Sequence, residues 1–164
     1  MNLNEYSAWL IDFSSKYTIA DDVKLTVYIA GLIEELNEYN LADTVKGKKK
    51  ELGDVLAYLV LALDKVGFPL LAVFSKFNDD QLTVSQLSMQ LAGFLKRLYR
   101  GDNKITDCVF ILINYHDFIL NELIQLNITV EELIEINYNK LTKRDVNNTL
   151  KGNGDDRWIN LKKH

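Results

Sequence analysis

Apolar residues recur at helical spacing along nearly the whole chain, and no segment alternates apolar and polar positions as a β-strand does. The pattern predicts an all-α fold, a helical bundle. The expected helices cover residues 4–16, 23–41, 51–66, 70–77, 84–99, 106–126 and 130–143. Asp21 or Asp22 is expected to cap the second helix, and Gly67 with Pro69 to end the third.

The second and third helices are expected to form a hairpin around a lysine-rich turn at residues 46–50. The length suits one domain, which we place at residues 1–144. Residues 145–164 are polar and contain glycine, which predicts an irregular tail. Because glycine gives the backbone freedom, we also consider that the segment around Gly152 and Arg157 closes over a bound ligand as a lid.

A weak internal repeat relates the two halves of the chain. Residues 33–47 align with 85–99, and residues 53–67 align with 113–127. Carboxylates of the first half then fall over amides of the second: Glu34 over Gln86, Glu38 over Gln90, and Asp54 over Asn114. The alignment predicts an internal duplication of a helical hairpin whose second half is degenerate, because amides lack the charge that holds a hard cation. A chance alignment of two leucine-rich helices is the alternative.

Charge and cysteine content restrict the class of protein. A net charge of -4 and a pI near 5.2 argue against a nucleic-acid partner, since such proteins normally carry a basic face. The single cysteine, Cys108, excludes an intrachain disulfide and favours a reducing cytoplasm. The start of the chain lacks a secretory signal pattern. The longest apolar run, residues 55–63, is shorter than a membrane span, so no membrane partner is expected.

Two pairs of carboxylates occur on consecutive predicted helices, Glu35 with Glu38 and Glu51 with Asp54, each pair three residues apart. Residues at this spacing lie on one helix face, so two adjacent helices could direct four oxygen ligands at a divalent metal ion. The alternative is a solvated helix face. Because Glu51 and Asp54 open an almost entirely apolar helix, their burial without a counter-charge would be costly, which favours a metal site.

Two separated motifs carry a resemblance to a known family. The first is GLIEELNE at residues 31–38 followed by KELGDVLAY at residues 50–58, an EExxE and then an ExxD pattern. The second is NYNKLTKR at residues 137–144 followed by NTLKGNGDDR at residues 148–157. Together they resemble the MazG-like all-α nucleoside triphosphate pyrophosphohydrolases. Nearly eighty residues separate the two motifs, an arrangement that is similar to the dimeric dUTPase branch of that superfamily.

The resemblance implies an enzyme that hydrolyses a (deoxy)nucleoside triphosphate to the monophosphate and pyrophosphate, with Mg²⁺ as cofactor and Mn²⁺ as a substitute, in nucleotide house-cleaning. Glu35, Glu38, Glu51 and Asp54 would bind the metal, and Glu34, one position away, would be the general base. The implied nucleotide-binding residues are Tyr58, Asn137, Lys140, Arg144 and Arg157.

Two other interpretations stay open. One is a non-catalytic nucleotide-binding or sensing module, and the other is a helical adaptor whose carboxylates only solubilise it. A homodimer or higher homo-oligomer is expected, because the apolar residues 55–63 and the aromatic residues Phe74 and Phe77 exceed what a small bundle easily hides.

Overall fold

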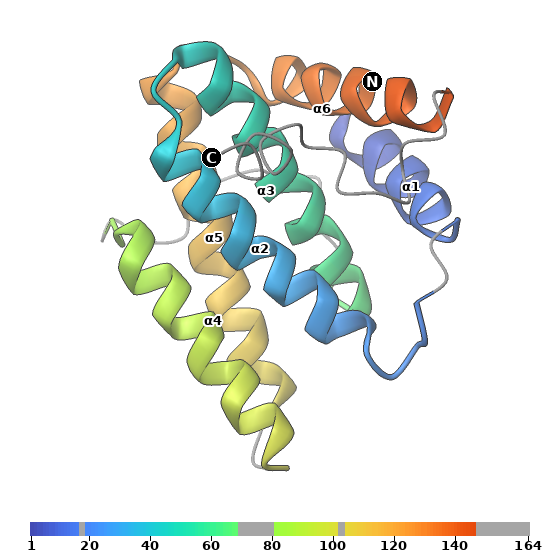
Figure 1. Ribbon diagram of the computed structural model, residues 1–164, viewed down its shortest axis with the longest axis vertical. Helices are drawn as coiled ribbons and strands as arrows, with labels where there is room; N and C mark the ends of the chain where they lie inside the picture. The colour runs from blue at the N-terminus through green and yellow to red at the C-terminus, as the bar shows by residue number, and fades with distance from the viewer. Residues whose placement is uncertain (17–18, 69–80, 102–103, 147–164) are drawn as a thin grey trace, which may run out of the picture.

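The structure is a computed structural model that describes residues 1–16, 19–68, 81–101 and 104–146. This part of the chain forms helices and no strand, so the predicted all-α bundle is confirmed (Figure 1). The helices are α1 (Leu3–Ser14), α2 (Lys24–Leu41), α3 (Val45–Lys65), α4 (Val84–Tyr99), α5 (Ile105–Gln125) and α6 (Val130–Val146). The helix predicted at residues 70–77, together with Phe74 and Phe77, lies outside the described residues, as does the chain beyond Val146.

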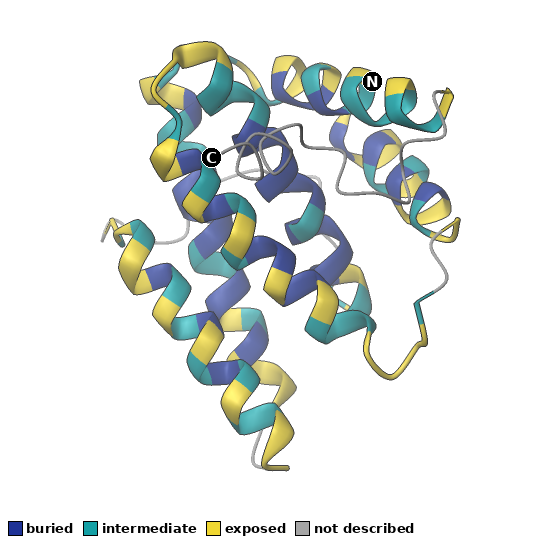
Figure 2. Ribbon diagram, viewed as in Figure 1, coloured by how far each residue is buried: buried dark blue, intermediate teal, exposed yellow. Residues whose placement is uncertain are grey.

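Helix α3 is the central element of the bundle. It packs against α1, α2, α5 and α6, while α4 packs against α2 and α5. Figure 2 shows α3 buried along most of its length, and every residue from Val55 to Leu63 is buried except the half-buried Tyr58. The apolar run that favours an oligomer is therefore covered within one chain. Exposed apolar side chains lie elsewhere, for example Met89 and Phe110, each 70% exposed.

The hairpin of α2 and α3 forms as predicted, but its turn is in a different place. Residues 42–44 make the turn, and the lysine-rich residues 46–50 belong to the first turns of α3. The prediction of a lysine-rich turn is therefore wrong. Thr44 explains the difference, because its side-chain oxygen accepts a hydrogen bond from the backbone N–H of Gly47 at 3.0 Å and so caps the helix early.

The ends of the hairpin differ in how well the sequence predicts them. Val23 is the N-cap of α2 and gives no side-chain cap, so the expected aspartate cap is wrong. Asp21 instead forms ion pairs with Lys24 at 3.3 Å and Lys65 at 2.7 Å. At the other end, Gly67 has a φ of 71° and follows Val66, the C-cap residue of α3, which confirms that it ends the helix; Pro69 lies outside the described residues.

Helix α6 runs across one end of the bundle and packs against α1 and α3 (Figure 1). It continues through Asp145 and Val146, so the irregular tail cannot begin at residue 145 as predicted. Asp145 forms an ion pair with Lys16, which ties the end of α6 to the chain just after α1. This placement brings residues 137–144 of the second motif against the first motif.

The second hairpin, α4 with α5, is the one predicted to be a degenerate copy. The Asn114 side chain donates a hydrogen bond to the side-chain oxygen of Gln90 at 3.1 Å, so two of the aligned amides are in contact. The duplication itself stays a prediction from the sequence.

Candidate metal and nucleotide site

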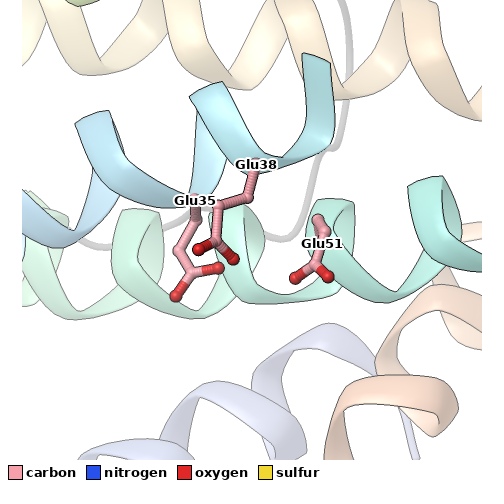
Figure 3. A group of neighbouring side chains, drawn as sticks. All are labelled: Glu35, Glu38 and Glu51. Atoms are coloured by element: carbon pink, nitrogen blue, oxygen red, sulfur yellow. The ribbon is translucent and has the colours of Figure 1, made fainter. Parts of the chain in front are cut away.

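Three carboxylates meet between α2 and α3. Glu35 and Glu38 extend from α2 toward α3, which carries Glu51 (Figure 3). One oxygen from each of the three lies within 4.8 Å of the others. We call Glu35, Glu38 and Glu51 the three-carboxylate group. The spacing on α2 explains it, because residues three apart lie on one face and that face packs against α3.

Burial and mutual repulsion disfavour the charged form of these carboxylates, and Lys50 and Lys140 supply part of the counter-charge at Glu51. Glu51 is only 4% exposed. The pKa of Glu35 is raised to about 8, chiefly by burial and then by the negative charges of Asp54, Glu38 and Glu51, while Lys140 opposes the shift. A divalent cation bound by these oxygens would relieve the repulsion, so the donor set fits a hard metal ion.

The fourth predicted ligand, Asp54, is held differently. Its carboxylate contacts the ammonium group of Lys140 and accepts a hydrogen bond from the Asn137 amide at 2.7 Å. Asp54 is 6% exposed, and burial raises its pKa while Lys140 opposes that shift. The structure thus gathers three of the four predicted ligands and places the fourth one turn along α3, against a lysine.

Helix α6 supplies the cationic side of the site. Lys140 Nζ lies 3.9 Å from Glu51 Oε2 in addition to its contact with Asp54. Its side chain is only 13% exposed, so Lys140 is not a solvated basic residue at the end of the helix. Asn137 is fully buried beside it. The spacing along the chain predicts that three residues lie on one face of α6, namely Asn137, Lys140 and Arg144. In the structure that face lies against the carboxylates.

A pocket of about 130 Å³ opens beside these groups. Four predicted site residues line it: Glu35, Asp54, Tyr58 and Arg144. The rest of the lining is mostly apolar and comes from α1, α2, α3, α6 and the chain between α1 and α2: Leu10, Phe13, Ser14, Ile19, Val27, Tyr28, Ala57, Leu61 and Leu141. An apolar cavity of roughly 150 Å³ accommodates one benzene ring, so this pocket has the size and character to receive a single planar ring.

Tyr58 is held in the pocket wall by a close helix contact. A Cβ atom added to Gly31 would lie 2.5–2.7 Å from three atoms of the Tyr58 ring. Only glycine at this position of α2 leaves room for the ring. The two segments of the first motif therefore fit together sterically, because Gly31 begins the segment at residues 31–38 and Tyr58 ends the segment at residues 50–58.

The predicted general base is not brought to the carboxylates and pocket. Glu34 is exposed on α2 and is not part of the three-carboxylate group. Arg157 and the proposed lid lie outside the described residues. The structure therefore gives the general-base and lid hypotheses no support.

One contributor was missed from the sequence. The Tyr6 hydroxyl donates a hydrogen bond to Asn137 Oδ1 at 2.6 Å. Tyr6 falls on the apolar face of α1 with Leu3 and Leu10, and a tyrosine on such a face generally needs a polar partner for its hydroxyl. That signal was available, but the partner is 131 residues away and could not be identified.

Comparisons of the chain with models of protein families, with curated proteins and with solved structures found no match. The resemblance to MazG-like pyrophosphohydrolases therefore stays an expectation from the two sequence motifs. Among the described residues, no helix is both long enough and apolar enough to cross a membrane.

Proposed function

We propose that this protein hydrolyses a nucleoside triphosphate, a deoxynucleotide or a noncanonical one, to the monophosphate and pyrophosphate in a Mg²⁺-dependent reaction. The observation that carries the proposal is the position of the three-carboxylate group beside a ring-sized pocket, with Glu35 common to both. A nucleotide has the matching parts, namely a planar base and a polyanion that binds divalent metal.

The donor set suits Mg²⁺, which binds through a few carboxylates, retained waters and substrate phosphates. Mn²⁺ prefers the same oxygen ligands and is a proposed substitute. Bound metal would neutralise phosphate charge and lower the pKa of a water. Burial of Glu51 and Asp54 argues against the adaptor alternative for these two residues, because carboxylates that serve only solubility lie in solvent.

The residues of this chain have distinct proposed roles. Lys140 and Arg144 bind phosphate oxygens as cations, Asn137 positions Asp54, and Tyr58 presents its ring to the base. A water oxygen forms a bond to phosphorus as the bond between the α and β phosphates breaks. Glu34 is the proposed acceptor of the proton from that water, and Arg157 is a proposed phosphate contact.

Pyrophosphate release tests the proposal. A panel of common and damaged triphosphates is incubated with the protein and Mg²⁺, and the products are separated by chromatography. We expect equimolar monophosphate and pyrophosphate, no turnover in the presence of a chelator, and loss of turnover in Glu38→Gln. Glu131→Gln makes the same charge change at an exposed position on α6 and should retain full activity.

Two outcomes would contradict the proposed reaction. Orthophosphate as the product would mean cleavage at a different bond. Nucleotide binding in calorimetry without any product would favour the non-catalytic binding or sensing module.

Homodimer formation and a cytoplasmic location belong to the same proposal. The dimer is supported by exposed apolar residues such as Met89 and Phe110, and the location by the buried thiol of Cys108. Sedimentation at micromolar concentration tests the dimer, and a monomer there would contradict it.

A further inference from the structure

Three helices meet at one buried chain of hydrogen bonds. Tyr6 on α1 donates to Asn137 Oδ1 on α6 at 2.6 Å, and Asn137 Nδ2 donates to Asp54 Oδ1 on α3 at 2.7 Å. Tyr6 and Asn137 are fully buried, and Asp54 is 6% exposed. Water therefore has little access with which to replace either hydrogen bond, and a missing donor would leave a buried group unsatisfied.

The chain of hydrogen bonds has a direction. Burial, with a contribution from the charge of Asp54, raises the pKa of Tyr6 above its usual value, so its hydroxyl stays protonated and acts as a donor. An asparagine amide has one oxygen that accepts and one nitrogen that donates. Because Tyr6 occupies the oxygen, the nitrogen must face Asp54.

The backbone of Asn137 has little room to move. A Cβ added to Gly53, the residue before Asp54, would lie 3.1 Å from the Asn137 Cβ and 3.7 Å from its Cα. Helices α3 and α6 are thus in close contact at this point. With the helix positions set, rotation of the amide is the main freedom left to the Asn137 side chain.

We propose that Tyr6 is a positioning residue for the metal site: it holds the Asn137 amide with Nδ2 toward Asp54 and thereby orients the Asp54 carboxylate beside Glu51. The inference rests on the proposed function, since it concerns a ligand of the proposed metal site. Without the Tyr6 hydroxyl, the Asn137 amide loses the hydrogen bond to its oxygen and is held only by its contact with Asp54. The amide then has more freedom to move, so one of the two contacts that orient Asp54 becomes less well defined.

The test measures binding of Mn²⁺ alone by electron paramagnetic resonance, without nucleotide or turnover. Tyr6→Phe keeps the ring and removes the hydroxyl. Loss of such a supporting hydrogen bond typically costs 10- to 100-fold in metal affinity, so we expect Mn²⁺ affinity about tenfold weaker. Tyr115→Phe removes another fully buried hydroxyl from α5, a helix without proposed site residues, and should bind Mn²⁺ as the wild type does.

A double-mutant cycle separates positioning from general stability. If Tyr6 acts through Asn137, Tyr6→Phe should weaken Mn²⁺ binding in the wild-type background and have no further effect in an Asn137→Ser background. Should Asn137→Ser fail to fold, the side-chain amide resonances of asparagine in Tyr6→Phe give a second measurement. We expect the Asn137 pair to move or broaden, and an unchanged pair would overturn the inference.

The outcomes distinguish this inference from the proposed function. Wild-type protein that binds no Mn²⁺ would overturn the metal site and the inference with it. The inference alone would be overturned if Tyr6→Phe bound Mn²⁺ as tightly as the wild type. It would also be overturned if Tyr6→Phe still weakened Mn²⁺ binding in the Asn137→Ser background. If Mn²⁺ binding changes as expected in the variants but the wild type releases no pyrophosphate, the hydrolytic function would be overturned and the role of Tyr6 would stand.

Discussion

The ammonium group of Lys140 contacts the carboxylate of Asp54, although the two residues are 86 positions apart in the chain. The same ammonium lies 3.9 Å from Glu51 Oε2. A lysine from α6 therefore supplies positive charge to two of the proposed metal ligands on α3. In the protein without metal, this contact offsets part of the cost of burying those carboxylates.

Removing the Lys140 charge should destabilise the metal-free protein. Breaking one side of a buried ion pair costs about 3–5 kcal/mol, and we expect about 2–3 kcal/mol for Lys140→Met because the side chain keeps some contact with solvent. Saturating Mg²⁺ should restore much of this loss, since the cation takes over the neutralising charge. Thermal melts with Mg²⁺ and with a chelator measure the loss of stability under each condition. Lys143→Met, at an exposed position of the same helix, is the control. An equal loss under both conditions would contradict this role for Lys140.

Stability should depend on pH through Glu35. Its pKa is raised from 4.5 to about 8 by burial and by nearby carboxylates, so between these values the folded protein binds more protons than the unfolded chain. Stability of the metal-free protein therefore falls as pH rises through this window. Glu35→Gln should remove the effect and raise Tm at about pH 9 by roughly 3–6 °C, with little difference at about pH 5. A difference in Tm between the wild type and Glu35→Gln that stays constant across this pH range would contradict this role of Glu35.

A substitution of Glu34 should separate catalysis from metal binding. As the proposed general base, its replacement by glutamine should lower kcat by roughly 10²–10⁴ at saturating Mg²⁺. Because Glu34 is exposed and outside the three-carboxylate group, Mn²⁺ affinity should not change. Steady-state kinetics measure kcat, and a Mn²⁺ titration of the same preparation measures the metal affinity. Full activity in Glu34→Gln would assign the proton transfer to another group.

Gly31 controls the position of the Tyr58 ring. In Gly31→Ala the new methyl group would lie 2.5–2.7 Å from the ring, which must shift within the pocket wall. If Tyr58 stacks on the base, KM for the nucleotide should rise about three- to tenfold, the range that an aromatic contact contributes. Gly93→Ala is the matched control, because its nearest neighbour would be 3.7 Å away and alanine favours the helix. An unchanged KM in Gly31→Ala would contradict the stacking role.

Local signals predicted most of the helices. Helix α4 illustrates this: Thr83 and Gln86 form a capping box at its start, and the apolar residues Leu87, Leu91 and Phe94 follow at helical spacing. The start of α3 was missed because Thr44 caps it from just before the lysine-rich segment, where the apolar periodicity is weak. Apolar periodicity indicates the buried face of a helix, so it does not locate a first turn that is made of polar residues.

Part of the candidate site could also be predicted from the sequence. Glu35 and Glu38 share a helix face by their spacing alone, and the hairpin brings Glu51 opposite them. The association of Asp54 with Lys140 rather than with the other carboxylates was not predicted. It depends on where α6 crosses α3, and the distance along the chain between them carries no information about that crossing.

The amino-acid sequence by itself determined the helical class, the hairpin and the helix faces on which the carboxylates and the Asn137, Lys140, Arg144 series lie. These properties depend on residues within a few turns of one another. Only the tertiary structure decided which groups meet: three carboxylates together, Asp54 against Lys140, and Tyr6 behind Asn137. The physical reason is that contacts between distant helices are set by packing angle and burial, which arise from the whole core at once.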